Sequence, residues 1–333
     1  MHFFESNDNN ILAVDHGNYA VKTPDIVFKS GLRADTLAPA MDEDYISYKD
    51  LKWTCADEIP DYSRTKTEDD TLFVQTLFAA AKEAKAGNLD LSKPIHLAIG
   101  LPPMHMRTEK KEYEKYFRQR STTRLIFNGK GTDIMLEDVH VFPQGLSAIT
   151  YAVTAANEKK SDPVKFVNYP SLLIVDIGGG TADVIYIRDG KPVTSLCKSY
   201  ELGTNFLIES IENSLTSNVR NINVSFRIVE DIIMGRPNIY TIDPTNEESK
   251  QVLSIINKEK RNHVQKLLSR IGMDISDVKS IPCIYEGGGS ALLKDEITSD
   301  RMEIYRSRYY QFLTDTHLNA CGYRYLTELA LRS

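Results

Sequence analysis

The chain has 333 residues, 41% of them hydrophobic and 26% charged, with 18 glycines and 13 prolines. This length predicts about two domains of roughly 100 to 200 residues each, and the composition excludes collagen-like and disordered chains. The formal charge of −6 gives no general attraction to nucleic acid or anionic lipid, so no direct nucleic-acid contact and no membrane contact are expected.

The cysteines and the amino terminus indicate a cellular location. Four widely spaced cysteines without a CxxC pair favour neither a zinc knuckle nor a disulfide framework. The first ten residues, MHFFESNDNN, are too polar for a signal peptide or an anchor, and no apolar run is long enough to span a membrane. The expected location is therefore the cytoplasm.

A weak internal repeat is the strongest organisational signal. ILAVDHGN (Ile11 to Asn18) and LLIVDIGG (Leu172 to Gly179) share a pattern at an offset of 161 residues. Each copy predicts a buried strand, a tight turn at Asp-x-Gly and two further strands, at 19–22 and 26–29 in the first copy and at 182–187 and 193–198 in the second. The duplication predicts two similar domains that face each other across a cleft.

The other predicted elements follow in chain order. Residues 33–70 show no clear period and give no prediction. Helices are predicted between Thr67 and Gly87 and at 107–120, 143–157, 205–219, 225–234, 247–271, 291–297 and 316–332, the last interrupted at Gly322. Strands are predicted at 95–101, 139–142 and 281–286, with a hairpin turn at Asn128-Gly129 and a domain crossover within 159–170.

The first candidate site motif is Asp15-His-Gly-Asn-Tyr-Ala-Val-Lys22. A strand that ends in Asp before a glycine turn lets backbone N–H groups approach phosphate oxygens, and Lys22 adds a point charge. Taken alone, the segment is more typical of an ordinary turn with a solvated lysine.

The second motif, Asp176-Ile-Gly-Gly-Gly-Thr-Ala-Asp183, is more specific. Three glycines with a threonine form a backbone cradle that side chains would obstruct, although a glycine-rich hairpin is the alternative. Asp15 and Asp176, at matching strand ends, are suited to hold a hydrated Mg²⁺ beside phosphates.

The third motif is Glu286-Gly-Gly-Gly-Ser-Ala-Leu-Leu293, where glycine backbone can lie flat against a purine or a sugar. The chain contains neither a GxGxxG fingerprint nor a Walker A loop, which disfavours a Rossmann or P-loop protein.

These motifs resemble the superfamily of actin, sugar kinases and DnaK-type chaperones, and within it the bacterial plasmid-segregation actins of the ParM family. The resemblance rests on Asp15-x-Gly-x-x-x-x-Lys22, Phe142-Pro-Gln-Gly-Leu-Ser-Ala148, Asp176-x-Gly-Gly-x-Thr-x-Asp183 and Gly287-Gly-Gly-Ser-Ala-Leu292, in this order. It implies a two-domain α/β actin-like fold of duplicated ribonuclease-H-like type, with a nucleotide cleft between the domains. Domain I would hold residues 1–165 and the terminal helix 316–333, and domain II residues 170–315.

The resemblance also implies roles for single residues. Gln144 would orient the attacking water, Asp183 would lie near that water, and Asp15 and Asp176 would hold Mg²⁺ through water. The remaining ligands of ATP (or GTP) would be Gly17, Asn18, Lys22, Gly178, Gly179, Gly180, Thr181, Gly203, Asn205, Gly287, Gly288, Gly289 and Leu292. For Gln144 the alternative is a helix N-terminal residue. Glu230 is expected on a solvated helix face, and the His16 imidazole is expected in solvent rather than against phosphate.

The implied function is a slow Mg²⁺-dependent ATPase, or GTPase, that polymerises with itself and segregates plasmid DNA through a separate DNA-binding adaptor protein. A neutral glutamine is a poor base, which is why slow hydrolysis is expected. The alternatives are a small-molecule kinase of the same superfamily and another bacterial cytoskeletal actin; a chaperone module is the least favoured.

Overall fold

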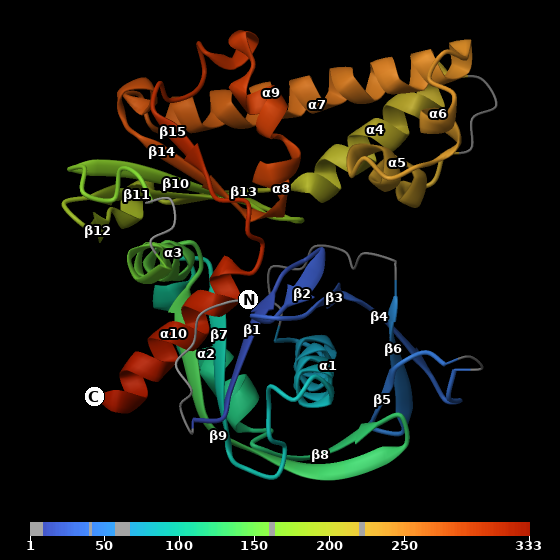
Figure 1. The fold of residues 1–333 in the computed structure, drawn as a ribbon, viewed down its shortest axis with the longest axis vertical. Helices are drawn as coiled ribbons and strands as arrows, with labels where there is room; N and C mark the ends of the chain where they lie inside the picture. The colour runs from blue at the N-terminus through green and yellow to red at the C-terminus, as the bar shows by residue number, and fades with distance from the viewer. Residues whose placement is uncertain (1–8, 40–41, 57–66, 160–163, 220–223) are drawn as a thin grey trace. The chain divides into compact units, whose positions relative to one another are not determined.

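The computed structural model describes residues 9–39, 42–56, 67–159, 164–219 and 224–333. The chain divides into two compact units (Figure 1). Unit 1 comprises Met1–Val164 with Thr316–Ser333, and unit 2 comprises Lys165–Asp315. Among the described residues, no helix is both long and apolar enough to cross a membrane.

Unit 1 is built on a nine-stranded sheet in the order β3-β2-β1-β7-β9-β8-β5-β6-β4. The strands β1, β7 and β9 run parallel in its middle, and the outer pairs are antiparallel. The strands are β1 Ile11–His16, β2 Ala20–Lys22, β3 Val27–Lys29, β4 Gly31–Asp35, β5 Tyr45–Tyr48, β6 Leu51–Ala56, β7 Ile95–Leu101, β8 Thr122–Phe127 and β9 Lys130–Pro143.

Helices cover both faces of this sheet. The sheet curves around α1 (Thr71–Lys85), which shares its core with α2 (Met106–Arg118) (Figure 1). The opposite face, with Ile11, Ala13 and Ala98, packs against Tyr323 of α10 (Leu318–Arg332), and α10 in turn packs against α3 (Leu146–Lys159). The parallel strands in the middle of the sheet are therefore covered by helices on both faces.

Unit 2 has a smaller mixed sheet in the order β12-β11-β10-β14-β15, with β13 paired to β11. Its strands are β10 Ser171–Ile177, β11 Ala182–Arg188, β12 Lys191–Pro192, β13 Lys198–Tyr200, β14 Cys283–Glu286 and β15 Tyr310–Phe312. Its α-helices are α4 Thr204–Asn218, α5 Phe226–Ile233, α6 Ile239–Ile242, α7 Glu247–Asp274, α8 Gly287–Leu292 and α9 Lys294–Thr298, and 3-10 turns lie at Thr194–Leu196, Val278–Ser280 and Asp300–Met302.

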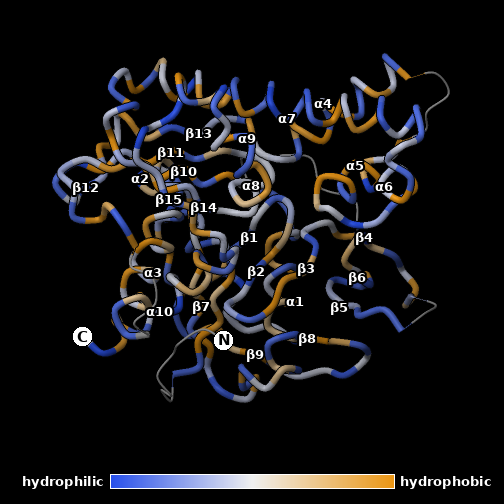
Figure 2. Tube along the Cα trace, turned by 45° about the horizontal axis from the view of Figure 1, so that its top comes forward, coloured by the Kyte–Doolittle hydropathy of each residue, from blue (hydrophilic) through white to orange (hydrophobic). Residues whose placement is uncertain are grey.

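The core of unit 2 joins this sheet to two amphipathic helices. Hydrophilic and hydrophobic residues alternate along α7 (Figure 2), and its apolar stripe includes Val264 and Leu267. These side chains share one buried cluster with Leu207 of α4 and Val175 of β10. Helical periodicity in the sequence therefore marks the buried faces correctly.

Several local predictions are confirmed. The strand at 95–101 is β7, and α4 begins directly after Gly203. The hairpin at Asn128-Gly129 joins β8 to β9, with positive φ values of 49° and 77° that match a type I′ turn. Both copies of the repeat are central strands, β1 and β10, each paired with the antiparallel strand that follows it.

Two other segments differ from the predictions or had none. Residues 33–70, for which there is no prediction, contain the end of β4 and all of β5 and β6. The periodicity does not reveal these strands because edge strands such as β4 are largely exposed; residues 40–41 and 57–66 lie outside the described part. The strand predicted at 193–198 is a 3-10 turn in which the N–H of Cys197 donates to the Val193 carbonyl.

Helix boundaries also differ from the predictions. The helix expected from Thr67 begins at Thr71, and the one expected at Pro143 begins at Leu146, because β9 continues to Pro143. The glycines at 287–289 lie inside α8 rather than before a helix. The helix α10 passes through Gly322 without interruption, since this glycine provides close packing rather than a break.

Candidate functional site

The first group of predicted site residues lies where β1 of unit 1 ends. Asp15 faces Lys22 of β2 in the antiparallel register, with 3.8 Å between Lys22 Nζ and Asp15 Oδ2. Only 5% of Asp15 is exposed. The cation next to this nearly buried carboxylate offsets part of its desolvation cost.

The turn after Asp15 is tight. The N–H of Gly17 donates to the Asp15 carbonyl at 3.0 Å, and a Cβ at Gly17 would lie 2.6 Å from the Ala20 carbonyl oxygen. The Asn18 carbonyl accepts a hydrogen bond from Ser30 Oγ at 2.7 Å. The loop therefore requires glycine at position 17, and Ser30, between β3 and β4, holds it in place.

Gln144 lies in the loop between β9 and α3, beside Asp15. Its Nε2 donates to Asp15 Oδ1 at 3.2 Å, and its backbone N–H donates to the Leu101 carbonyl at 2.9 Å. It precedes α3 by two residues, so it is not a residue of that helix. The amide is thus held next to the carboxylate.

Asn319 of α10 fixes this loop, although no motif in the sequence indicates this residue. Its Oδ1 accepts from the N–H of Gly145 at 2.9 Å, and Gly145 has a φ of 72°. Because the two residues are 174 positions apart, no local pattern reveals the contact.

The prediction that the side chain of His16 points to solvent is wrong. It is 4% exposed, and its Nε2 lies 2.9 Å from Thr76 Oγ1 of α1. Side chains alternate along a strand, so His16 follows Val14 toward the α1 face while Asp15 points to the other side.

The second group lies where β10 of unit 2 ends. Asp176 pairs in register with Asp183 on β11 and with Glu286 on β14, and residues directly opposite each other share one face of a sheet. Asp183 is 8% exposed and Glu286 is 2% exposed. Three neighbouring carboxylates repel one another, and a hard divalent cation with oxygen ligands would relieve this repulsion.

The glycine loop after β10 is held by the amino terminus of α4. The N–H groups of Gly203, Thr204 and Asn205 donate to the carbonyls of Gly180, Gly178 and Gly179, respectively, at 3.3, 3.0 and 2.8 Å. In a trans peptide the C=O and N–H groups point in opposite directions, so the N–H groups of residues 179–181 are turned away from α4. The three N–H groups therefore point to the side of the loop opposite α4, which makes the loop a candidate anion site.

Gly203 and Asn205 support this loop closely. A Cβ at Gly203 would lie 2.2 Å from the Gly179 carbonyl oxygen, so no side chain fits there. Thr181 Oγ1 donates to Asp183 Oδ2 at 3.2 Å, which links the loop to the row of carboxylates. Asn205 Oδ1 is buried and has no hydrogen-bond partner among the described residues.

The glycines at 287–289 serve mainly as packing positions. A Cβ at Gly287 would lie 2.3 Å from Asp176 Oδ1, and one at Gly289 would lie 2.5 Å from Ile177 Cγ2. Gly288 alone is exposed, and Leu292 packs half-buried against the core. The short helix α8 therefore lies directly against the end of β10 and the Asp176 carboxylate.

Glu230 is buried, not on a solvated helix face. It is 5% exposed, and burial raises its pKa, although Arg236 Nη1 lies 3.7 Å from its Oε2. The amphipathic helix α5 turns this residue toward the core beside Val229.

The two groups are built alike. Asp15 pairs with Lys22 in one unit and Asp176 pairs with Asp183 in the other, each across an antiparallel pair at the end of the repeated strand. The repeat thus places a carboxylate at the same point of each sheet, with a cation opposite it in one unit and a second carboxylate in the other.

Comparison with protein families agrees with this arrangement. Residues 13–146 match the family described as actin like proteins N terminal domain, and residues 167–314 match the one described as plasmid segregation protein ParM, C-terminal. No curated protein sequence matches the chain.

Solved structures show the same fold. An archaeal actin homologue, Ta0583, has a TM-score of 0.72 at 18% identity, covering 97% of this chain and 99% of its own. The apo ParM protein of pSK41 has a TM-score of 0.65 at 17% identity, with 98% and 99% covered. A ParM from Clostridium botulinum, solved as a 15-stranded filament, has a TM-score of 0.68 at 14% identity, with 97% and 100% covered.

The fold is therefore the two-domain α/β fold of actin homologues, as the motifs had predicted. The chain belongs to the actin-like ATPase superfamily, near the ParM proteins.

Proposed function

We propose that this protein is a Mg²⁺-dependent ATPase, or GTPase, that assembles with itself into filaments and segregates plasmid DNA through a separate adaptor protein. Units 1 and 2 would be actin-like domains I and II, and each would contribute one of the two groups described above. The comparisons support segregation and self-assembly, because residues 167–314 match a model described as plasmid segregation protein ParM and one structural relative was solved as a filament. The adaptor rests on the family resemblance of the motifs alone.

The observation that carries the proposal is the glycine loop of unit 2. The N–H groups of residues 179–181 point away from α4, and Asp176 and Asp183 lie beside them. Polyphosphate oxygens need such donors, and Mg²⁺ needs carboxylates that hold it through water. The archaeal homologue Ta0583 has also been solved in complex with ADP, which supports a nucleotide as the ligand.

The residues present fit Mg²⁺ better than a softer metal, because the row contains only oxygen donors. Bound there, the ion would neutralise phosphate charge during hydrolysis. Lys22 and Asn18 would bind on the β-phosphate side, and Asp15 would hold Mg²⁺ through water together with Asp176. Gln144 would orient the attacking water.

The test is pelleting and light scattering of the full chain across protein concentration, with ATP or GTP and with Mg²⁺ or a chelator. We expect a critical concentration that requires Mg²⁺ and nucleotide. Asp176→Ala should abolish hydrolysis, whereas Asp295→Ala, on the exposed first turn of α9, should leave it unchanged. Turnover that needs an added acceptor and shows no critical concentration would instead identify a kinase.

A further inference from the structure

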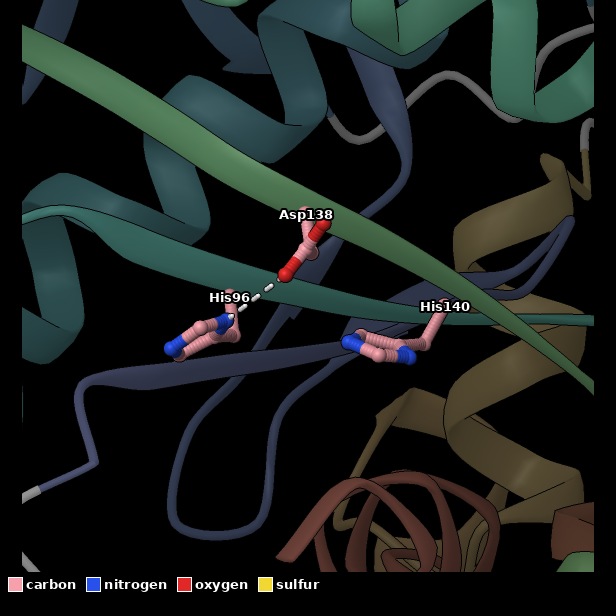
Figure 3. A group of neighbouring side chains, drawn as sticks. All are labelled: His96, Asp138 and His140. Carbon is pink, nitrogen blue, oxygen red and sulfur yellow. Dashed lines mark ion pairs between the residues drawn. The ribbon is translucent and has the colours of Figure 1, made fainter. Parts of the chain in front are cut away.

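Unit 1 contains a second cluster of chemically active side chains, outside the groups described above. His96 lies near the start of β7, and Asp138 and His140 lie on the neighbouring strand β9. One ligand atom from each of the three lies within 4.8 Å of the others. Figure 3 shows the two rings and the carboxylate turned toward a common space, with a nitrogen of each ring facing the other side chains.

A β-bulge creates this arrangement. The register between β7 and β9 shifts after the pair Ile95 and Leu136, so that His96 lies opposite Asp138 and Glu137 is the extra residue. Leu136 and Val139 both belong to the core on the α1 face, which simple alternation would not allow. The extra residue therefore moves Asp138 and His140 to the face of His96, and bulges commonly re-aim side chains at sites.

Two ring nitrogens in this cluster have no hydrogen-bond partner. His96 Nδ1 and His140 Nε2 are buried, and neither has a partner among the described residues. His96 Nδ1 lies 3.6 Å from Asp138 Oδ2, which is too long for a hydrogen bond. Buried polar atoms are nearly always satisfied, so we expect a further group to bind these two nitrogens.

Glu137 is placed to support a ligand role of His96. Its Oε2 lies 3.6 Å from His96 Nε2, on the opposite side of the ring from Asp138. Histidines that bind metals usually direct the other ring N–H to a carboxylate, which fixes the tautomer. If Glu137 holds the proton on Nε2 of His96, the lone pair of His96 Nδ1 faces Asp138 and His140.

We propose that His96, Asp138 and His140 bind a divalent transition metal of the zinc class, with Glu137 as the outer carboxylate. Two imidazoles and one carboxylate are typical zinc ligands, whereas Mg²⁺ prefers oxygen donors alone. Bond lengths near 2.0 to 2.1 Å place neighbouring ligand atoms of a tetrahedral site about 3.3 Å apart, so small side-chain rotations close the cluster.

The site is separate from the Asp15 group. His96 pairs with Ile11 of β1, four residues before Asp15, which at the rise of a strand is about 13 Å along the sheet. The bound ion would join β7 to β9 and stabilise unit 1. The proposal does not depend on nucleotide binding.

The test is titration of Zn²⁺ into the full chain, without a histidine tag and without nucleotide, followed by calorimetry and thermal unfolding. We expect one saturable Zn²⁺ per chain and a rise in Tm of at least about 2 °C. His96→Gln and His140→Gln should each weaken binding by about 100-fold, and Glu137→Gln by roughly 10-fold, as is usual for an outer carboxylate. Millimolar Mg²⁺ should not displace the ion.

His105→Gln is the matched control, since His105 pairs with Glu109 on α2 and lies outside the cluster; it should bind Zn²⁺ like the wild type. Should the variants fail to fold, Co²⁺ absorption of the wild-type chain still tests the proposal, because tetrahedral coordination gives intense visible bands. Absence of a stoichiometric site, or undiminished affinity in His96→Gln and His140→Gln, would overturn it.

Discussion

Gln144 and Asp15 are 129 positions apart in the chain, yet Nε2 of Gln144 donates a hydrogen bond to Oδ1 of Asp15 at 3.2 Å. The contact joins the end of β1 to the loop after β9, two parallel strands of unit 1 separated by β7. A neutral amide held beside a carboxylate can direct water but cannot take up its proton, which agrees with the slow hydrolysis proposed for this protein.

Replacing Gln144 by Ala should therefore slow hydrolysis by roughly 10- to 100-fold, the scale on which removal of a single positioned polar group acts. Nucleotide affinity should change little, because the proposed phosphate loop of unit 2 is untouched. Single-turnover hydrolysis and equilibrium binding of a fluorescent nucleotide separate the two effects. Equal losses of binding and hydrolysis would contradict a role in orienting water.

Asn319 offers a second test of the same loop. Asn319→Ala removes the acceptor for the Gly145 N–H, so it should slow hydrolysis and lower the free energy of unfolding by about 1 kcal/mol. Asn319→Asp keeps an acceptor oxygen at that position and should restore most of the hydrolysis rate. If Ala and Asp slow the reaction alike, the hydrogen bond does not position Gln144.

Sequence patterns predicted the strands and turns of the site better than its long-range contacts. β1 and β10 were found because a buried strand followed by Asp-x-Gly has a strong local signature. The pairing of Asp176 with both Asp183 and Glu286 depends on strand register, which no local pattern specifies. The motif that begins at Glu286 therefore does not show that this residue lies among the carboxylates.

Glycines were the least reliable signal, because the same residue serves turns and close packing. Gly17 does form a tight turn. Gly287 and Gly289, in contrast, let β10 and α4 pack closely against α8, and Gly322 lets Ser147 pack closely against α10. The sequence shows only that a side chain is absent. Which neighbour occupies the space is decided by tertiary structure.

Gly203→Ala tests the support of the glycine loop. The added Cβ would lie 2.2 Å from the Gly179 carbonyl oxygen, a backbone atom that cannot move without displacing the loop. We expect nucleotide affinity to fall at least about tenfold, since misplaced N–H donors lose their phosphate hydrogen bonds. Gly272→Ala is the control, because it lies in α7 with its nearest neighbour 3.9 Å away. Unchanged affinity in Gly203→Ala would exclude this loop as the phosphate site.

Gly322→Ala tests the packing of α10 on α3. Alanine favours helix over glycine by about 1 kcal/mol, so propensity alone predicts stabilisation. The new Cβ would, however, lie 2.2 Å from the Ser147 carbonyl oxygen, and overpacking of this kind costs about 1 to 3 kcal/mol. We expect a net decrease in the urea midpoint, whereas Gly272→Ala should raise it. A more stable Gly322→Ala protein would show that the two helices can separate at little cost.

His263 should make unit 2 sensitive to acid. It is 4% exposed on α7, next to the Phe206 ring, and burial lowers its pKa to about 4. The unfolded chain takes up a proton near pH 6.5 while the folded protein does not. The contribution of neutral His263 to the free energy of unfolding is therefore fully present above that pH. It should fall by up to about 1.4 kcal/mol per pH unit between roughly 6.5 and 4. Urea unfolding followed by circular dichroism, compared with His263→Gln, isolates this contribution from the carboxylates. Parallel pH profiles for the two proteins would show that His263 is protonated equally in the folded and unfolded states.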